Sequence, residues 1–528
     1  MFDSNLAITK LDLAAGSSGR FTMKKILLRI VRWGAALLLI LIVVIFARGV
    51  YAFRDRNPDY KLNLKIDTAK SRAEPHPLRV GFGRIKINPD LSDPKRSVWV
   101  AGFSQHRAAT AIHDDLWAVA CVLDDGHSRV GMVVLDAIGF FHDDVLAVRR
   151  ACAAEWKLDY TIVCSTHNHS TPDLMGLWGP DVLHTGVDAG YRQQVIAAAA
   201  KSLGDAIAAL QPTRMAIHEI STPTEGLVAD TRKPIVFDPD IRVMHFTSPT
   251  TGATIGSIVG WANHPETPWG QNTEITADFC GYVRETLEHG FTNGGKSFAT
   301  GVGGIHLYVN GAVGGLMTTH PSVTVRDPFL QQDFKEPSHE KSRAVGHQLA
   351  TRILRKFAET NTATTTVAPI AIHARTIEIP IDNNLFLAGA YLGMIDRGHV
   401  RWKTMRTEVA LVTIGDASIA CVPGEIYPEI INGGIERAPG GDFDIKPLEV
   451  PPLRELMSGR IKFVFGLAND ELGYIIPKSE WDVKPPYIYG SKGHVYGEVN
   501  SCGPDTARLV HSGLAELFME TKSAETMK

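Results

Sequence analysis

The chain has 528 residues, of which 44% are hydrophobic and 21% are charged, a composition typical of a globular protein with a large buried core. Its formal net charge of −3, without a basic stripe, gives no electrostatic basis for binding nucleic acid. The six cysteines show no C-x-x-C spacing, so they are interpreted as buried apolar side chains rather than zinc ligands, with disulfide pairing left open.

The N-terminal region departs from this globular pattern. Basic residues between positions 24 and 32 precede an uncharged, mostly apolar run at residues 33–47. A basic flank before an apolar run is typical of a membrane anchor or a secretory signal, and residues 23–53 are predicted to be one of the two. Residues 1–22 are predicted to form a disordered tail. The charge bias predicts that the rest of the chain lies outside the cytoplasm, on the periplasmic face of the inner membrane in a bacterium.

Beyond a polar linker at residues 54–77, short β-rich runs alternate with helical stretches, which predicts an α/β fold with a mixed sheet core flanked by helices. The predicted strands are residues 130–135, 160–164, 255–259, 409–413, 418–422 and 461–465, and the predicted helices are residues 187–210 and 338–359. A threonine-rich segment at residues 362–366 divides the region 78–522 into lobes of residues 78–357 and 368–522 that share one core. No internal repeat is visible.

The most informative motif is S-T-H-N-H-S at residues 165–170, directly after the apolar run 160–164. Two imidazoles placed two residues apart at a strand end can direct nitrogen ligands to one point, as in many zinc sites. Histidines with this spacing also occur on exposed strands without any role, and the motif alone favours neither interpretation.

Polar residues follow other predicted strands in the same way. Asp136 ends one strand, His264 and Glu425 lie just beyond two others, and Tyr474 follows the strand at 461–465. Because side chains past the carboxyl ends of strands converge on the ligand crevice of open α/β sheets, these residues predict one shared site. Asp136 is a candidate either for orienting a ligand imidazole or for capping a turn.

Taken in order, these segments resemble the neutral/alkaline (non-lysosomal) ceramidase family, zinc amidohydrolases that split the amide bond of ceramide. S-T-H-N-H-S-T-P at residues 165–172 is similar to the family's T-H-T-H-S-G-P segment, and P-G-E at residues 423–425 matches its P-G-E. Residues 261–265, 466–474 and 496–506 supply further matching segments in the same order. The resemblance implies that residues 78–522 form one ceramidase-like catalytic domain whose two lobes share a metal site.

The resemblance also implies the ligands of that site. The zinc ligands would be His167, His264, Glu425 and Tyr474, a set that leaves a coordination position for water. A phenol ligand such as Tyr474 must be largely ionised, and a dication within bonding distance can ionise it.

Three further residues receive catalytic roles from the resemblance. His169 is placed to hydrogen-bond the metal-bound water or the developing oxyanion. Arg232, in D-T-R-K-P, resembles the family's N-R-S-P arginine, and Tyr496 resembles its oxyanion-binding tyrosine. A guanidinium and a phenol aimed at the tetrahedral oxygen would supply the electrostatic stabilisation that amide hydrolysis needs. From the residues alone, Arg232 is equally a solvated loop charge.

The resemblance fails at one functional position. Where the family carries a serine in G-D-V-S-P-N, residues 310–316 read N-G-A-V-G-G-L, so Ala312 replaces the aspartate and Gly314 the serine. A serine nucleophile at this place is therefore excluded, and attack by metal-activated water remains. Gly314 and Gly315 are expected to widen the site.

The sequence thus predicts a membrane-anchored or exported zinc hydrolase that cleaves the N-acyl amide of a ceramide-like lipid. Two alternatives stay open: a hydrolase of another amide or an ester, and a non-catalytic protein that kept the fold and lost the serine. The predicted partners are the lipid or other N-acyl amide substrate and, through the N-terminal segment, a membrane; nucleic acid is not among them.

Overall fold

The computed structural model describes residues 17–492 and 496–526, with side chains for residues 23–492 and 496–521. The chain divides into two compact units, Met1–Ala52 and Phe53–Lys528. In the first unit the described residues form helix α1 (Ser17–Ala52), so most of the predicted tail, residues 1–16, lies outside the described residues. The stretch Met23–Ala52 of α1 is long and apolar enough to cross a membrane, a property that a signal sequence shares.

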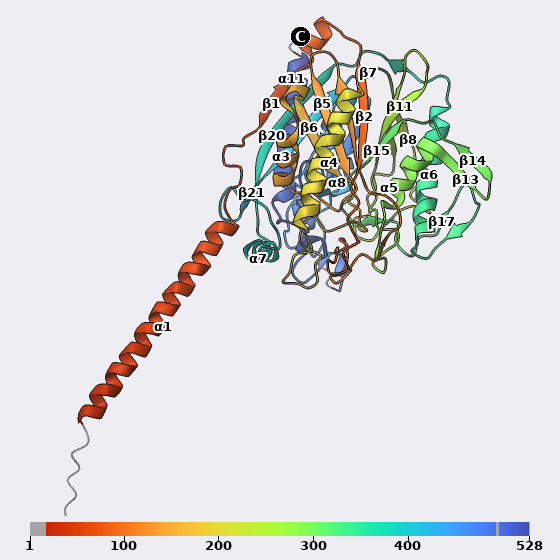
Figure 1. Ribbon diagram of the computed structural model, residues 1–528. Coiled ribbons are helices and arrows are strands. Elements are labelled where there is room, and N and C mark those ends of the chain that lie inside the picture. Colours follow the sequence, from red (N-terminus) through yellow and green to blue (C-terminus); the bar gives the residue numbers. More distant parts are fainter. Residues whose placement is uncertain (1–16, 493–495, 527–528) are drawn as a thin grey trace, which may run out of the picture. The chain divides into compact units, whose positions relative to one another are not determined.

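Three five-stranded sheets form the framework of the second unit (Figure 1). The first sheet has the order β6-β5-β4-β2-β7, the second β15-β11-β10-β8-β19 and the third β1-β20-β21-β22-β24. Their strands are β1 (Asn63–Ile66), β2 (Arg79–Lys86), β4 (Trp117–Asp124), β5 (Arg129–Leu135), β6 (Tyr160–Ser165), β7 (Gln211–Pro212), β8 (Arg214–Ile220), β10 (Ile241–Thr247), β11 (Thr254–Trp261), β15 (Ile305–Asn310), β19 (Thr364–Thr365), β20 (Ile370–Pro380), β21 (Thr404–Ile414), β22 (Ala417–Cys421) and β24 (Ile461–Phe465).

Helices and short strands fill the connections. The helices of the second unit are α2 (Ala69–Ala73), α3 (His142–Ala151), α4 (Ala189–Ala208), α5 (Asp278–His289), α6 (His339–Phe357), α7 (Asn384–Leu392), α8 (Pro428–Asn432), α9 (Leu453–Leu456), α10 (Tyr496–Val499) and α11 (Thr506–Thr526). The short strands are β3 (Ala111–Ile112), β9 (Ala229–Asp230), β12 (Glu274–Ile275), β13 (Gly290–Asn293), β14 (Lys296–Thr300), β16 (Met317–Thr318), β17 (Val325–Arg326), β18 (Asp333–Phe334), β23 (Glu425–Ile426) and β25 (Tyr474–Ile475).

The three sheets repeat one topology that the sequence does not reveal. The equivalent sets are β2-β4-β5-β6, β8-β10-β11-β15 and β20-β21-β22-β24. In each set the first three strands pair antiparallel in succession, and the fourth strand pairs parallel with the third. A long helix follows the fourth strand of every set: α4, α6 and α11, respectively.

The fifth strand of each sheet closes the sets into a ring. β7 pairs with β2 of the first set just before the chain enters the second set, and β19 pairs likewise with β8 before the third. β1, which precedes the first set, pairs with β20 of the third. Residues 54–77, predicted to be a linker, thus contain a strand, because the edge of β20 offers unpaired backbone groups.

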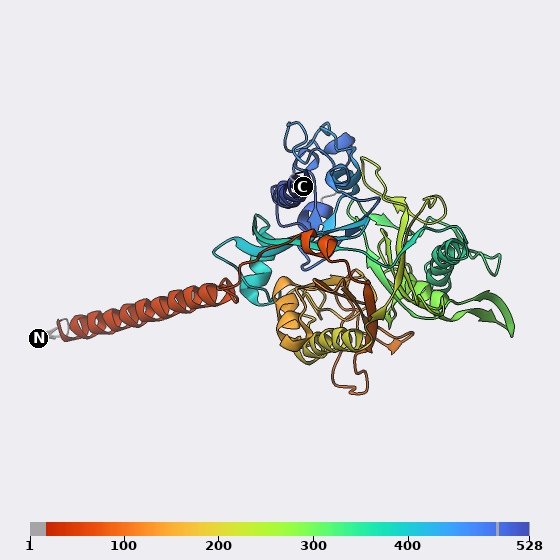
Figure 2. The same ribbon diagram turned by 90° about the horizontal axis from the view of Figure 1, so that it is seen from above.

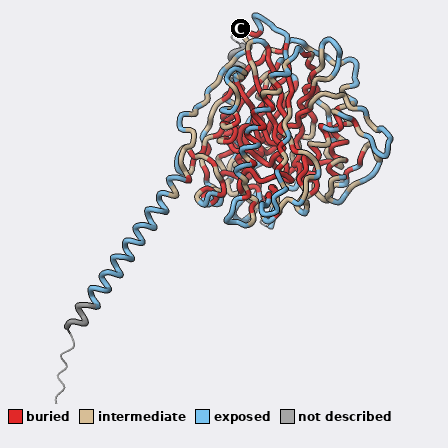
Figure 3. The backbone as a smooth tube through the Cα atoms, viewed as in Figure 1, coloured by how far each residue is buried: buried red, intermediate tan, exposed pale blue. Residues whose placement is uncertain are grey.

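One apolar core lies where the sheets face one another. It draws side chains from all three sets, for example Val134 of β5, Ile258 of β11 and Ile419 of β22. Figure 2 shows the sheets grouped around this core, and Figure 3 shows the buried residues concentrated there. On the outer faces α3 and α4 cover the first sheet, α5 and α6 the second, and α11 the third. Strands such as β6 are therefore buried on both faces, which explains their continuous apolar runs.

The predicted fold class, a mixed α/β core flanked by helices, is confirmed. The run at residues 160–164 is β6, and the helix expected at residues 338–359 is α6, whose N-cap Ser338 accepts a hydrogen bond from the Lys341 N–H group. The predicted lobe 78–357 contains the first two sets, and the lobe 368–522 contains the third.

A buried ion pair joins the first set to the third. Arg149 of α3 donates two hydrogen bonds, at 2.9 and 2.7 Å, to the carboxylate of Glu408 in β21. The hydroxyl groups of Tyr60 and Tyr160 donate to the same carboxylate. Burial alone would raise the pKa of Glu408, but Arg149 more than offsets this and lowers the pKa to about 2.

We expect Glu408→Gln to lower the free energy of unfolding by about 3 to 5 kcal/mol, because it leaves the buried Arg149 charge uncompensated. The control is Glu378→Gln, which removes an exposed ion pair with Arg401 and costs less than about 1 kcal/mol. Chemical denaturation at pH 7 measures the free energy of unfolding of both variants. If Glu408→Gln lowered it no more than Glu378→Gln does, the buried pair would not stabilise the contact between the first and third sets. Because the pKa of Glu408 is lowered from 4.5 to about 2, its contribution is present above the upper value and lost as the pH falls through the lower one.

Candidate metal centre

The parallel strand pairs of all three sets end at one site. His167 follows β6 of the first set, His264 follows β11 of the second, and Glu425 and Tyr474 follow β22 and β24 of the third. Glu425 and Tyr474 are register partners in the short parallel pair β23–β25, so the backbone itself places them side by side. The carboxyl ends of the parallel strands therefore supply donors to one crevice.

His167 occupies a strained backbone position. Its φ of +65° lies in the left-handed region, which costs a residue with a side chain about 1 kcal/mol or more. The neighbouring backbone is held by two hydrogen bonds, from Thr166 N–H to Leu135 O at 2.9 Å and from Asn168 N–H to Ala137 O at 3.1 Å. The exit of β5 thus fixes the turn that presents this imidazole.

Backbone carbonyl groups set the tautomers of the two predicted histidine ligands. Nδ1 of His167 lies 2.8 Å from the carbonyl oxygen of Ile138, and Nδ1 of His264 lies 2.6 Å from that of Met317. Since a carbonyl oxygen only accepts, each Nδ1 donates a proton and each Nε2 keeps an electron pair. Proteins commonly orient metal-binding imidazoles by such a contact.

Asp136, a sequence candidate for this orienting role, has other partners. Its carboxylate accepts hydrogen bonds from Arg284 at 2.8 and 2.7 Å and from the Trp117 N–H group at 2.8 Å. The orienting prediction is therefore wrong, because a buried guanidinium and a backbone donor occupy both carboxylate oxygens.

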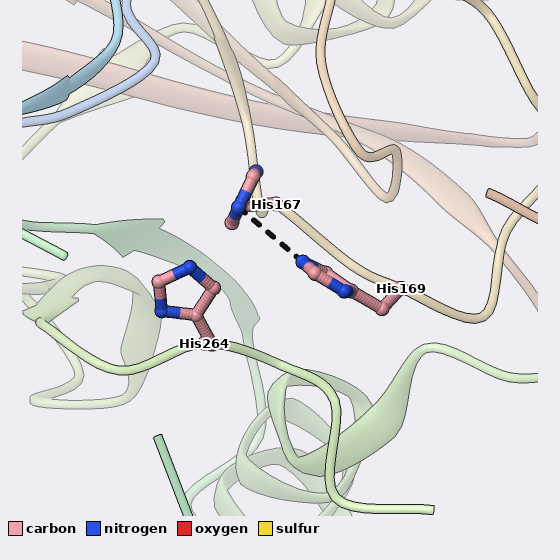
Figure 4. A group of neighbouring side chains, drawn as sticks. All are labelled: His167, His169 and His264. Carbon is pink, nitrogen blue, oxygen red and sulfur yellow. Dashed lines mark hydrogen bonds between the residues drawn. The ribbon is translucent and has the colours of Figure 1, made fainter. Parts of the chain in front are cut away.

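The side-chain donors converge on one point (Figure 4). One ligand atom from each of His167, His169 and His264 lies within 4.8 Å of the others, and the Nε2 atoms of His167 and His169 are 3.3 Å apart. Oε2 of Glu425 lies 3.0 Å from Nε2 of His264 and 3.2 Å from Nε2 of His167. The Tyr474 hydroxyl lies 3.4 Å from Nε2 of His264. A tetrahedral zinc site with bonds of about 2.1 Å requires similar ligand separations, so the donors are spaced for one divalent ion.

Electrostatic interactions at the site shift the pKa values of His264 and Glu425 in opposite directions. Burial lowers the pKa of His264, but the hydrogen bond to Glu425 more than offsets this and raises it above its usual value. Burial would likewise raise the pKa of Glu425, whereas His167 and His264 hold it well below its usual range. A proton and a metal ion compete for the same electron pair of His264, since only neutral imidazole is a ligand.

His169 reaches the cluster past Gly102. A Cβ atom at Gly102 would stand 2.4 Å from Cγ of His169, so a glycine with a φ of +104° is needed to leave room for the ring. Nδ1 of His169 lies 3.2 Å from Oε2 of Glu266. Burial, followed by the charges of His167 and His264, holds the pKa of His169 well below its usual value, and the ring is therefore neutral at pH 7.

The structure brings Tyr496 to the site but places Arg232 outside it. Tyr496 lines the same cavity as Tyr474, and their ring centroids are 6.0 Å apart. Arg232 is not among the described residues that line this cavity. Its Nη2 donates to the carbonyl oxygen of Glu480 at 2.8 Å, and its guanidinium lies 4.5 Å from the ring centroid of Tyr427. The catalytic roles of both residues stay predictions.

Tyr427 also fills the space beside Gly314. A Cβ atom at Gly314 would stand 2.3 Å from Cδ1 and 2.6 Å from the backbone nitrogen of Tyr427, separations that real Cβ atoms essentially never show. The expectation that Gly314 widens the site is therefore wrong. An aromatic ring from the third set occupies the volume that a side chain at this position would need.

An apolar cavity leads to the donors. His167, Glu425 and Tyr474 are among its polar lining residues. Its apolar lining includes Ile138, Phe141, Trp178, Ile381, Phe386 and Ile395. Helix α7, which contains no charged residue, contributes part of the wall. Such a cavity suits a ligand that carries hydrocarbon next to one polar, reactive group.

Two buried carboxyl groups at the site were not singled out from the sequence. Glu266 lies beside His169, and Glu471 lines the apolar cavity with only 3% of its surface exposed. Burial, followed by the charge of Glu425, raises the pKa of Glu471 well above its usual value, which favours the neutral acid. The available signal was proximity in sequence, because each lies within three residues of a predicted ligand.

Solved structures share this mixed α/β fold. Neutral ceramidase from Pseudomonas aeruginosa matches with a TM-score of 0.62 at 16% identity, over 85% of this chain and 75% of that chain. A structure of ceramidase complexed with C2 matches with a TM-score of 0.61 at 16% identity, over 85% of this chain and 76% of that chain. The fold is therefore neutral-ceramidase-like, as the sequence resemblance implies. No protein-family model matches the chain, and no curated protein matches it.

Metal affinity is expected to depend strongly on pH. We expect the apparent affinity for Zn²⁺ to fall at least about tenfold between pH 8 and pH 5.5, because protons compete for the histidine ligands and the pKa of His264 is raised. Calorimetric titration in two buffers of different ionisation enthalpy would measure both the affinity and the protons released. An affinity that does not change with pH would contradict the assignment of imidazole ligands.

Gly314→Ala is expected to destabilise the protein by about 1 to 3 kcal/mol, because the added Cβ overlaps the Tyr427 ring. The control is Gly190→Ala in the first turn of α4, where the new Cβ would meet only side-chain ends, Oδ1 of Asp188 at 3.2 Å and Nη2 of Arg96 at 3.7 Å. Thermal unfolding of both variants checks the expectation. A Gly314→Ala variant as stable as its control would show that Tyr427 moves to accommodate the added Cβ at little energetic cost.

Proposed function

We propose that this protein is a zinc-dependent hydrolase that cleaves the N-acyl amide of a ceramide-like lipid. The observation that carries the proposal is the convergence of the His167, His264, Glu425 and Tyr474 donors beside an apolar cavity, which all of them except His264 line. A metal-dependent hydrolase of a lipid amide needs these two features together. The likeness of the fold to neutral ceramidase supports the substrate class.

The donor chemistry fits zinc. Imidazole nitrogen and carboxylate oxygen are common zinc ligands, and under this proposal His167, His264, Glu425 and Tyr474 hold the ion. When bound, the ion supplies Lewis acidity towards a carbonyl group and towards water at neutral pH. Burial, followed by the charge of Glu425, raises the pKa of Tyr474 well above its usual value, so its phenol needs the charge of a cation in order to ionise.

His169 is the proposed proton carrier. Its ring is neutral, and its Nδ1 faces Glu266, so Nε2 can take the proton from the water that adds to the amide carbon. The same proton then passes to the amide nitrogen as the carbon–nitrogen bond breaks, which gives a carboxylic acid and an amine. Glu266 stabilises the transient imidazolium.

Tyr496 is the proposed donor to the developing oxyanion. Its hydroxyl is hydrogen-bonded with that of Tyr474, and its side chain lies at the edge of the cavity with 40% of the residue exposed. Arg232, predicted for the same role, contacts the ring of Tyr427, which in turn packs edge-on against Tyr474 of the site. Its proposed contribution is therefore to hold that ring in place.

The Gly314 region favours a second candidate, a hydrolase of another N-acyl amide or an ester. The expected serine hydroxyl is absent, the ring of Tyr427 occupies its place, and the Glu471 carboxyl group adds a polar group to the cavity wall. A panel of amides and esters with different head groups and acyl lengths separates the candidates. Cleavage of short soluble amides but never of ceramide would favour the second.

We further infer that the N-terminal unit is a membrane anchor or an export signal. Residues 23–52 are helical and apolar, and basic residues precede the apolar run. The charge bias supports a location of the catalytic unit outside the cytoplasm, at the outer face of the inner membrane in a bacterium.

His167→Ala and His264→Ala are each expected to remove bound zinc and to lower kcat by about 1000-fold or more, since each deletes a ligand. The control is His289→Ala, an exposed histidine outside the site, which is expected to keep both metal and activity. Metal content by atomic emission and hydrolysis of ceramide measure the outcome. Retained zinc in both ligand variants would overturn the ligand set. A wild-type protein that binds zinc but cleaves no amide or ester would favour a non-catalytic role.

A further inference from the structure

We propose that the catalytic unit docks on a lipid bilayer through an exposed apolar rim around the mouth of the cavity. The rim consists of Val182, Leu183, Leu385, Leu392 and Trp402. These side chains belong to three segments far apart in the sequence, yet each segment adjoins the cavity. The inference is independent of the zinc chemistry, and only its activity readout rests on the proposed function.

The first part of the rim is a loop at residues 176–187. Leu177 and Trp178 of this loop line the cavity. Further along, Val182 and Leu183 are 69% and 64% exposed. Adjacent apolar residues this exposed are unusual on the surface of a soluble protein and mark a site of interaction.

The second part of the rim is α7. Phe386 and Ala390 on one side of this helix line the cavity. Leu385 and Leu392 are 66% and 54% exposed. Because the helix carries no charged residue, its solvent-facing surface lacks the polar face of an ordinary surface helix.

The two parts meet beside the cavity. Gly176 lies so close to the Met394 carbonyl oxygen, just after α7, that a Cβ atom there would stand 1.9 Å from that oxygen. The next residue, Ile395, lines the cavity together with Trp178. The segments that carry the exposed leucines and valine therefore adjoin one cavity.

Trp402 has the surroundings of a tryptophan at a membrane surface. It is 61% exposed at a tight turn, between Arg401 and Lys403, and Arg401 and Thr404 form a backbone bridge across the turn. A tryptophan flanked by cations suits the interface of a bilayer, where the ring lies among head groups and the cations meet lipid phosphates.

The connection to the N-terminal helix favours the same occupant. Phe53, the first residue of the second unit, packs edge-on against Trp402 with ring centroids 4.5 Å apart. The carbonyl oxygen of Arg54 accepts a hydrogen bond from the N–H group of His399, a residue that lines the cavity. The residue before Phe53 is the last of the candidate membrane span. The chain would therefore leave a membrane entered by that span only a few residues before Phe53, which contacts Trp402 of the rim.

The role follows from this geometry. Docking the rim on a bilayer would open the cavity towards the acyl chains, so a lipid could enter without its hydrocarbon crossing water. An anchor alone holds the catalytic unit near a membrane but does not determine which surface of the unit faces the bilayer. The rim would determine that orientation.

The test uses the full chain in vesicles of phosphatidylcholine and phosphatidylglycerol. Val182→Cys and Leu385→Cys are labelled in turn with an environment-sensitive fluorophore, and the unsubstituted chain gives the background, since all native cysteines except Cys152 are buried. We expect emission at shorter wavelength and quenching by nitroxide lipids for both rim positions. The control is Asn293→Cys in the β13–β14 hairpin, which lies on the other side of the unit from α7 (Figures 1 and 2) and should stay in water.

Rim labels that stay as accessible to water as the control would overturn the proposal. A spectral change that follows protein density rather than lipid would overturn it in favour of self-association. As a second measurement, Leu385→Asp with Leu392→Asp should raise KM for a vesicle-borne lipid amide at least about tenfold while leaving hydrolysis of a short soluble amide unchanged. A wild type without any hydrolase activity would refute the proposed function, and the fluorescence result would still decide the docking.

Discussion

The structure depends on bringing the carboxyl ends of three parallel strand pairs, one from each sheet, to a single point. No set supplies enough donors for a metal ion by itself: the first gives His167 and His169, the second His264, and the third Glu425 and Tyr474. Donor separations of 3.0 to 3.4 Å leave little tolerance for movement between the sets. The ring closure by β1, β7 and β19 and the buried Arg149–Glu408 pair provide the rigidity that this constraint demands.

Burial gives the site its chemistry as well as its shape. The same desolvation that keeps His169 neutral also raises the pKa values of Tyr474 and Glu471, which favours the neutral phenol and the neutral acid. Under the proposed function, a divalent ion beside Tyr474 would favour ionisation of its phenol. The backbone carbonyls of Ile138 and Met317 contribute by removing the choice of tautomer, which leaves the two nitrogen electron pairs in place before any ligand arrives.

The departure at Gly314 shows how one loss in a site is compensated by packing from elsewhere. Losing a side chain there would leave a void in a close-packed interior, yet Tyr427 fills it and is itself covered by the Arg232 guanidinium. For the proposed function the consequence would lie in specificity, because Tyr427 occupies the place where the sequence resemblance implies a serine side chain. The proposed chemistry needs only the donors, His169 and Tyr496, all of which are retained.

Local patterns in the sequence determined the elements and several of the donors. The apolar runs that form β5, β6, β22 and β24 indicated strands buried on both faces. An imidazole or carboxylate directly after such a strand is therefore expected at the end of a sheet. The order of the matching segments also implied the neutral-ceramidase-like fold. Glu266 and Glu471 escaped notice, because a glutamate near a ligand in sequence has no pattern of its own.

Only the tertiary structure decided how the elements close on one another. The threefold repeat of sheet topology leaves no trace in residue identity, since each set satisfies the same hydrogen-bond geometry with different side chains. Whether Asp136 meets an imidazole or Arg284, and whether Gly314 faces space or Tyr427, depends on residues more than a hundred positions away. Such contacts depend on how distant segments pack and on which charges meet in the folded protein. A single sequence contains no local pattern that predicts them.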